Sequence, residues 1–395
     1  MPRIVYIAPY SPYPMTFGGS LHVEPLWRAL QAFGPTQLIV LGEMPAQEHR
    51  LRLRREGAWL YPSRRETPTG RIARCAKAAL AGRCIPAARY MNARRLAKLL
   101  ARLREHRPEV IVLGDTYLAT LATPMKGLGT KVFIDTLGSE SLAHQRMSRA
   151  AANLRTRLEF YILYRNTLAV ERRFFPQAHQ VWVVTDAEAE LYRRQLRVRD
   201  VRVLPNVLDM SRYQLRLPEE EGAVVYTGLY AYGPNELAAM ALIDCSRRMR
   251  ENGAPHHLYL VGRQPTQKML AAAAGQEQIT ITGEVADTHP YIARASVLAV
   301  PLATGGGTKF KILEAMALGR CVLTTPIGAE GMNLTPGIHA AVKSLDDFGR
   351  ELENLLKDPA RRAQLAGAGQ RFVRENFSTQ VLQARLKQCL ADVGF

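Results

Sequence analysis

Residues 296–319 read SVLAVPLATGGGTKFKILEAMALG, and the architecture of the chain follows from them. The first five residues form an apolar run, which predicts a buried strand of a parallel sheet. Three glycines at 305–307 follow, where the absence of side chains lets the backbone approach a ligand closely. The periodic apolar residues after them predict a helix that ends at Gly319. A strand, a glycine turn and a helix N-terminus in this order offer N–H groups and a positive dipole end to an anion.

Charged side chains at the start of this helix point to the same kind of ligand. Lys309 and Lys311 lie in the expected first turn, where cations oppose the helix dipole unless an anion such as phosphate is bound. Glu314 lies one turn further on, and a buried carboxylate there requires a partner, which a sugar diol would provide. The alternative is an ordinary capped helix in which Glu314 pairs with Lys311 on the same face.

The same segment, continued to residue 332, resembles the donor-site signature of the GT-B glycosyltransferases of family 4, also called glycosyltransferase group 1. These are retaining enzymes that use nucleotide sugars, and their motif usually has two glutamates. The second matches Glu314, which the resemblance implies binds the ribose hydroxyls, whereas Gly306 occupies the position of the first. The resemblance implies an α/β protein with the GT-B fold, in which two doubly wound Rossmann-like domains face each other across a cleft.

Two further stretches carry the resemblance. Residues 205–209, PNVLD, resemble the family's interdomain hinge, and residues 228–235, GLYAYGPN, resemble the loop after the first strand of its donor domain. Many members place an Arg and a Lys after that strand as a diphosphate clamp, and neither is present here. Arg263, which follows a predicted strand and a glycine, and Lys309 are the candidates to replace the clamp. An exposed loop residue is the alternative for Arg263.

The resemblance therefore implies a set of donor-binding residues in the second half of the chain. Of these, we expect Lys309, Glu314 and Arg263 to act in catalysis, with Lys309 neutralising the diphosphate. The expected donor-binding residues are Gly228, Gly262, Arg263, Glu284, Gly305, Gly306, Gly307, Thr308, Lys309 and Glu314. We expect no metal and no cofactor, because no acidic pair has a Mg²⁺-binding context and the helix dipole with Lys and Arg can stabilise the leaving diphosphate.

Short apolar runs alternate with helical segments in the first half of the chain, which predicts another doubly wound sheet. The chain exceeds the usual size of a single core. We therefore expect an acceptor- and membrane-facing domain over 1–205, the donor domain over 206–370, and a helix over 371–395 that packs back on the first domain. In the first half, strands are expected at 4–8, 37–41, 110–113, 131–135, 181–184 and 201–204, a helix over 21–33 and an irregular connection over 43–66.

Candidate site residues also occur in the first half. Ligands of doubly wound sheets bind at the carboxyl ends of the strands, where Asp115, Asp135 and Glu140 follow predicted strands. Gly18-Gly19 resembles the glycine loop that the family places near the donor diphosphate and the acceptor. His22 sits where that motif often has a histidine, and a purely structural role is its alternative.

The net charge of +18 is distributed unevenly along the chain. Residues 1–205 hold 33 Lys and Arg against 16 Asp and Glu, whereas the remainder is nearly neutral. Basic amphipathic segments over 71–107, extended by five arginines over 146–165, predict attachment to an anionic membrane surface. A solvated basic face over an ordinary core is the alternative. Nucleic acid is not expected as a partner, because zinc spacing, RNA-binding signatures and clustered base-reading aromatics are absent from the sequence.

The resemblance implies a retaining, metal-independent hexosyltransferase that moves a sugar from a nucleotide-diphosphate sugar to a glycan or polyisoprenyl-diphosphate-linked acceptor in bacterial-type surface polysaccharide assembly. We expect a cytoplasmic protein at the inner face of the plasma membrane, because no apolar run reaches spanning length and the five cysteines are scattered. Two alternatives remain open: a sugar-nucleotide epimerase or hydrolase on the same fold, and a non-catalytic membrane-associated scaffold with a degenerate donor site.

Overall fold

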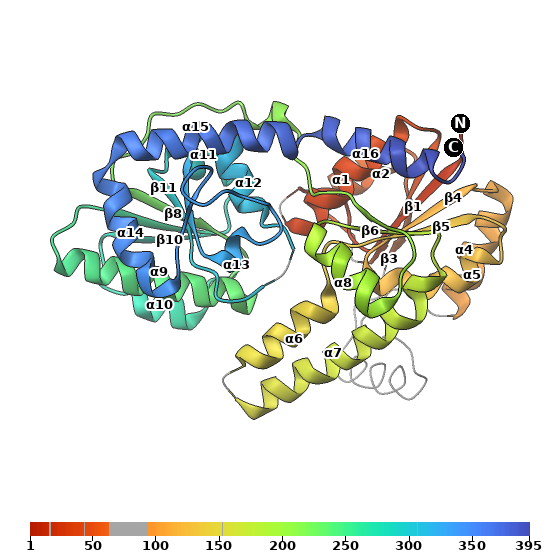
Figure 1. The fold of residues 1–395 in the computed structure, drawn as a ribbon, viewed down its shortest axis with the longest axis horizontal. Coiled ribbons are helices and arrows are strands. Elements are labelled where there is room, and N and C mark those ends of the chain that lie inside the picture. The colour runs from red at the N-terminus through yellow and green to blue at the C-terminus, as the bar shows by residue number, and fades with distance from the viewer. Residues whose placement is uncertain (16, 43, 63–92, 152, 306) are drawn as a thin grey trace. The chain divides into compact units, whose positions relative to one another are not determined.

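The computed structural model of the chain describes all residues except 16, 43, 63–92, 152 and 306, and it divides into two compact units. Met1–Val207 and Thr379–Phe395 make the first unit, and Leu208–Ser378 make the second (Figure 1). Each unit is built on its own parallel sheet with helices packed against it. The α/β architecture with two Rossmann-like domains that the sequence predicts is therefore confirmed.

Seven parallel strands form the sheet of the first unit, in the order β3-β2-β1-β4-β5-β6-β7. They are β1 (Ile4–Ala8), β2 (Thr36–Gly42), β3 (Trp59–Pro62), β4 (Val110–Gly114), β5 (Lys131–Asp135), β6 (Gln180–Val183) and β7 (Val201–Val203). Strand β1 pairs with both β2 and β4, so the order along the sheet reverses there. In doubly wound sheets this reversal marks the place where ligands bind, beyond the carboxyl ends of the strands.

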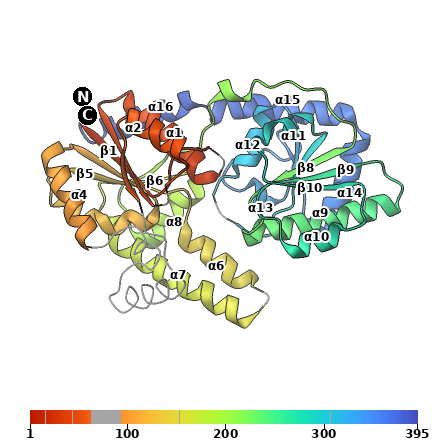
Figure 2. The ribbon, with the colours of Figure 1, turned by 180° about the vertical axis from the view of Figure 1, so that it is seen from behind.

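The strands of this sheet are apolar throughout because they are buried on both faces. Val5 and Ile7 of β1 point into one core, and Ile4 and Tyr6 point into the other. The first core is shared with helices α4, α5, α7 and α8, and the second with α1, α2 and α16, which lies beside α1 (Figure 2). The helices are α1 (Gly18–Gln31), α2 (Gln47–Arg55), α4 (Ala93–His106), α5 (Ala122–Lys126), α6 (Glu140–Ala150), α7 (Leu154–Phe174), α8 (Asp186–Leu196) and α16 (Thr379–Ala391).

Two predictions for the first half are wrong in detail. The connection over 43–66 contains helix α2 and edge strand β3. The sequence does not predict α2, because this helix buries only Leu53 and therefore lacks an apolar stripe. Helix α1 begins at Gly18 rather than at residue 21. Glycine is a poor helix former, but Gly19 is required by packing, since a Cβ there would lie 2.7 Å from the rings of Tyr10 and Phe17.

Six parallel strands form the sheet of the second unit, in the order β10-β9-β8-β11-β12-β13, with the reversal between β8 and β11. The strands are β8 (Ala223–Thr227), β9 (His257–Val261), β10 (Ile279–Gly283), β11 (Val297–Val300), β12 (Cys321–Thr324) and β13 (Ala341–Val342). The helices are α9 (Gly233–Glu251), α10 (Gln267–Ala273), α11 (His289–Arg294), α12 (Phe310–Ala317), α13 (Pro326–Ala329), α14 (Leu345–Lys357) and α15 (Pro359–Asn376). The glycine turn between β11 and α12 therefore lies at the reversal point of its sheet.

Candidate functional site

The turn after β11 leads directly into α12, as the sequence predicts. Lys309 is the N-cap residue and α12 runs from Phe310, so Lys309 precedes the first turn instead of lying within it. The side chain of a charged lysine has no hydrogen-bond acceptor. Lys309 therefore does not cap the backbone N–H groups in the first turn of α12. At the other end, Gly319 has φ 71° and its N–H donates to the Met316 carbonyl at 2.9 Å, which ends the helix as expected.

Buried polar groups surround the glycine turn. The hydroxyls of Thr304 and Thr308 are buried and have no hydrogen-bond partner in the described part of the chain. Lys309 is also buried, and its Nζ donates to the Gly307 carbonyl at 2.7 Å, so the ammonium folds back on its own turn. Gly306, expected at the position of the missing glutamate, lies outside the described residues. An orphaned buried hydroxyl costs free energy that a bound ligand would recover.

Glu314 is largely buried and is contacted by two side chains that the sequence does not reveal. Its Oε1 accepts a hydrogen bond from the Tyr213 hydroxyl at 3.3 Å and lies 3.8 Å from Nε2 of His289. The rings of Tyr213 and His289 pack with their centroids 4.9 Å apart. Burial lowers the pKa of His289, but the nearby negatively charged carboxylate of Glu314 outweighs this effect, so the pKa of His289 is raised above its ordinary value.

Lys311 is bonded to α9 and not to Glu314. Its Nζ donates to Oδ1 of Asn235 at 3.0 Å and lies 3.9 Å from the centre of the Tyr226 ring, while the Tyr226 hydroxyl donates to the same Asn235 oxygen at 2.7 Å. Loss of solvent lowers the pKa of Lys311 to about 7, because burial and the charge of Lys309 outweigh the opposing negative charge of Glu314. The pairing of Glu314 with Lys311 offered by the ordinary-helix alternative is therefore not adopted.

The other expected donor-site residues lie at the carboxyl ends of β8, β9 and β10. Gly228 follows β8 and Gly262 follows β9, and the two glycines meet backbone to backbone. Arg263 is half-buried beside them, and its carbonyl accepts from the Tyr230 N–H at 2.9 Å. Glu284 is exposed directly after β10. Strand ends and turns thus gather these residues at one edge of the sheet of the second unit.

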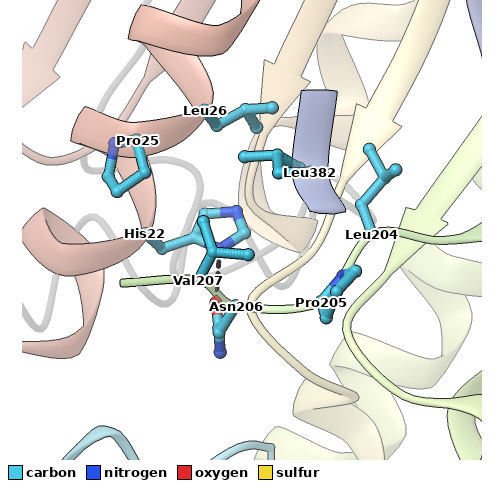
Figure 3. A pocket seen from close by; sticks show the side chains of 8 residues that line it. All are labelled: His22, Pro25, Leu26, Leu204, Pro205, Asn206, Val207 and Leu382. Carbon is cyan, nitrogen blue, oxygen red and sulfur yellow. Dashed lines mark hydrogen bonds between the residues drawn. The ribbon is translucent and has the colours of Figure 1, made fainter. Parts of the chain in front are cut away.

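In the first unit, His22 on α1 is buried and bridges two distant segments, of which Figure 3 draws the one that carries Asn206. Its Nε2 lies 2.8 Å from Oδ2 of Asp135, and its Nδ1 lies 2.6 Å from Oδ1 of Asn206. Both ring nitrogens therefore face oxygen acceptors, which favours the doubly protonated ring. Burial lowers the pKa of His22, whereas its contacts with Asp135 and Asn206 raise it. The contacts outweigh burial, so the pKa of His22 lies above its ordinary value. The Tyr6 hydroxyl donates to the same Asp135 oxygen at 3.0 Å.

A small pocket opens beside His22. It is lined by His22, Pro25 and Leu26 of α1, by residues 204–207 after β7, and by Leu382 of α16 (Figure 3). Gly18 and Gly19 form the first two residues of the same α1. The structure therefore brings His22 and Asp135 together, as two of the predicted site residues. Asn206 is not predicted as a site residue, because its only sequence signal is its place after a proline at the expected hinge.

A second cluster of carboxyl groups lies at the carboxyl ends of β4 and β5. Asp115 is buried with φ 109°, an uncommon conformation for a residue other than glycine, and its carboxylate accepts from the Tyr117 N–H at 2.9 Å. Burial and the negative charge of Glu140 raise the pKa of Asp115 to about 7. Glu140 accepts from the Tyr117 hydroxyl at 2.7 Å, and burial raises its pKa as well. Strained, pKa-shifted carboxyl groups are typical of functional sites.

The described helices include none that combines the length and apolar character needed to cross a bilayer. The described residues also contain no group of three or more His, Cys, Asp or Glu arranged to hold a metal ion. The first part of the expected membrane segment, residues 71–92, lies outside the described residues, and α4 carries its continuation.

Comparison with known proteins links the second unit to one family. Residues 221–358 match the family described as Glycosyl transferases group 1. The chain is also 24% identical over 216 residues to a GDP-mannose-dependent monoacylated alpha-(1-6)-phosphatidylinositol monomannoside mannosyltransferase of Corynebacterium glutamicum. That match covers 47% of this chain and 55% of the relative, so it spans about half of each.

Similar solved structures cover nearly the whole chain. Sucrose-phosphate synthase from Thermosynechococcus elongatus superposes with a TM-score of 0.71 at 16% identity, over 100% of this chain and 99% of the other. HepE of Anabaena, solved in complex with UDP, superposes with a TM-score of 0.68 at 12% identity, over 99% of this chain and 100% of the other. At such low identity this likeness shows the fold alone, and the fold shared by these neighbours is the one expected from the sequence.

Proposed function

We propose, from the premise that residues 221–358 belong to the group 1 glycosyl transferases, that the chain moves a sugar from a nucleotide-diphosphate sugar to a glycan or polyisoprenyl-diphosphate-linked acceptor. The GT-B fold of the whole chain agrees with this premise. The observation that carries the proposal is the glycine turn before α12, where the hydroxyls of Thr304 and Thr308 are buried without partners among the described residues.

The turn has the chemistry of a diphosphate site. An anion placed there would accept hydrogen bonds from the Thr308 hydroxyl and from the backbone N–H groups at the start of α12. The side chain of Lys309, the N-cap residue, does not accept from these N–H groups. Lys309 would exchange its bond to the Gly307 carbonyl for a phosphate oxygen, a charge-assisted hydrogen bond and therefore a stronger one. Glu314, one turn further on, would accept from the two ribose hydroxyls. HepE of Anabaena, which has the same fold and was solved with UDP and with UDP-glucose, supports a nucleotide sugar as the donor.

The same groups supply the catalysis that a departing diphosphate needs. Negative charge grows on the diphosphate as the glycosidic bond breaks, and Lys309 with the positive end of α12 would stabilise it. Arg263, half-buried at the end of β9, is the second cation that we assign to this task. We propose that transfer proceeds with retention and without a metal ion, with the leaving phosphate helping to deprotonate the acceptor.

We assign the acceptor to the first unit and to a membrane surface. The candidate groups are His22, Asp135 and Glu140 at the carboxyl edge of its sheet. Residues 1–205 carry the basic excess of the chain, with 33 Lys and Arg against 16 Asp and Glu. This charge suits a lipid-linked acceptor at the anionic inner face of a plasma membrane, as in bacterial-type surface polysaccharide assembly.

Thermal unfolding with a panel of UDP- and GDP-sugars tests the donor site. A donor present at about 100 times its dissociation constant should stabilise the chain by roughly 2.7 kcal/mol. Glu314→Gln should lose most of this stabilisation, whereas Glu277→Gln, an exposed carboxylate before β10, should keep it. If Glu314→Gln responded to the same donor as fully as the unchanged chain, the assignment of the ribose site would be wrong.

Product analysis separates transfer from the two other functions. With a polyisoprenyl-diphosphate sugar as acceptor, a transferase should lengthen the lipid-linked glycan and release the nucleoside diphosphate. Free sugar formed equally without acceptor would indicate a hydrolase, and a changed sugar still attached to its nucleotide would indicate an epimerase. Donor binding with no product of any kind would indicate a scaffold.

A further inference from the structure

Helix α7 carries an apolar stripe that faces away from the protein. Leu154, Leu158, Tyr161 and Ile162 are 79%, 55%, 46% and 50% exposed. Their spacing of four, seven and eight residues places them on one side of the helix. Four of the thirteen large apolar side chains exposed in the described part of the chain thus fall within nine residues. A contiguous exposed apolar patch marks an interaction surface, whereas single exposed residues do not.

The opposite side of α7 already has its partner within the first unit. Helices α6 and α7 form a pair that extends away from the sheet, as both views show (Figures 1 and 2). The His144 and Thr167 side chains meet at 3.3 Å, and the Ser148 hydroxyl donates to the Arg157 carbonyl at 2.9 Å. The His144 ring also stacks on Phe160. Because these contacts fix the orientation of α7, the apolar stripe is held outward.

Arginines flank the stripe and continue its face along the helix. Arg155, Arg157, Arg165, Arg172 and Arg173 are all exposed. The acids of α7 are Glu159, which is exposed and lies 3.2 Å from Arg155, and Glu171, which is buried on the other side. The outward face therefore combines an apolar stripe near the N-terminus of α7 with a strong excess of positive charge.

We propose that this face of α7 docks on an anionic lipid bilayer. Leu154, Leu158, Tyr161 and Ile162 enter the boundary between headgroups and acyl chains, and the arginines bind lipid phosphates. An amphipathic helix with apolar residues on one face and flanking cations is the kind that lies in the membrane interface. Tyr161 suits this depth because its ring is apolar and its hydroxyl is polar, and Arg165 already donates to that hydroxyl at 3.3 Å.

Charge decides between a bilayer and a second copy of the chain. A symmetric dimer through this face would set the same arginines against one another, because a two-fold interface uses the same patch on both subunits. Like charges brought together in this way oppose association. An anionic bilayer satisfies both the apolar stripe and the arginines at once.

Vesicle sedimentation with the full chain tests this proposal. The chain should bind vesicles of equal parts phosphatidylcholine and phosphatidylglycerol at least about tenfold more tightly than pure phosphatidylcholine, and about 0.5 M salt should release it. Leu158→Glu with Ile162→Glu should weaken binding at least about tenfold. The matched control is Leu237→Glu with Leu270→Glu, which changes two exposed apolar residues of the second unit and should leave vesicle binding unchanged. Replacing Arg157 and Arg165 by Gln should cost about fivefold for each arginine.

Two measurements show how the proposal would fail. If the Leu158→Glu, Ile162→Glu variant and the Arg157→Gln, Arg165→Gln variant both bound the anionic vesicles as well as the unchanged chain, α7 would not be the docking surface. If Leu158→Glu with Ile162→Glu turned a dimer into a monomer in light scattering and left vesicle binding intact, the face would belong to a second copy. The stabilisation by a nucleotide sugar without vesicles should be unchanged in this variant, so the donor site and the docking face are tested separately.

Discussion

A Cβ atom added at Gly262 would lie 1.8 Å from the carbonyl oxygen of Gly228 and 2.9 Å from its carbonyl carbon. The two glycines end β9 and β8, and the Gly228 N–H donates to the Val261 carbonyl at 3.0 Å. Gly262 also has φ 149°, which L side chains rarely adopt. Backbone contact between two strand ends thus shapes the edge where the donor is proposed to bind, and only glycine fits at position 262.

Gly262→Ala should therefore destabilise the second unit by about 2–4 kcal/mol, because it combines overlap with fixed backbone and an unfavourable φ. Gly275→Ala is the matched control, since Gly275 has φ 72° but no atom within 4 Å of an added Cβ. That variant should lose only about 1 kcal/mol. Calorimetric unfolding of both variants measures the difference. Equal losses would mean that the contact with Gly228 relaxes freely.

Local sequence patterns predict the sheets and the glycine turn because the interactions that form them are close in the chain. Strand β11 and the N-terminus of α12 are adjacent, and parallel strands buried on both faces read as apolar runs. The contacts of Glu314 are different in kind. Tyr213 lies 101 residues before it on a short helical turn, and His289 begins a separate helix. These contacts of Glu314 depend on tertiary packing alone, so no residue spacing in the sequence predicts them.

The lowered pKa of Lys311 would couple nucleotide binding at the proposed donor site to the uptake of a proton. With a pKa of about 7, Lys311 is mostly neutral near pH 8, and a diphosphate bound at the start of α12 would raise its pKa. Binding of UDP or GDP should then take up close to one proton at about pH 8. Isothermal titration calorimetry in buffers of different ionisation enthalpy measures this uptake.

A pair of lysine variants identifies the group that takes up the proton. Lys311→Met should abolish the uptake, and Lys268→Met, which changes an exposed lysine of α10, should leave it unchanged. The same dependence on buffer in both variants would assign the proton to another group.

His289 should stabilise the second unit mainly at acidic pH. Its pKa is raised by Glu314, so the ion pair contributes fully below the ordinary histidine value of about 6.5 and is lost as the pH rises through the higher folded value. His289→Gln should therefore lower the stability by up to about 1 kcal/mol near pH 6 and by much less near pH 8.5. Melting curves at the two pH values compare the variants. His257→Gln, which changes a histidine bonded to Thr280 at 2.8 Å, is the control for loss of a histidine from the same unit.

Glu171 should have the opposite effect on the first unit. It is fully buried on α7 and accepts from both the N–H and the hydroxyl of Ser141, at 3.3 and 2.5 Å. Burial is the main cause that raises its pKa to about 7, against an ordinary glutamate value near 4.5. The stability linked to this group is fully present below about pH 4.5 and is lost as the pH rises through about 7, because the unfolded chain releases the proton more readily.

Glu171→Gln should therefore raise the free energy of unfolding of the first unit by roughly 1–3 kcal/mol near pH 8 and change it little near pH 5. The amide oxygen of Gln can accept from the Ser141 N–H, and its NH2 group can donate to the Ser141 hydroxyl oxygen, so the variant removes the charge and still makes two hydrogen bonds. Glu159→Gln on the exposed side of α7 is the control and should show no gain at pH 8. Some pH dependence should remain in Glu171→Gln, because the pKa of Asp115 is also raised to about 7. Calorimetric scans at both pH values measure this difference. Equal destabilisation of Glu171→Gln at pH 5 and pH 8 would contradict the proposed effect of the raised pKa, because the site would then require the carboxyl group at every pH.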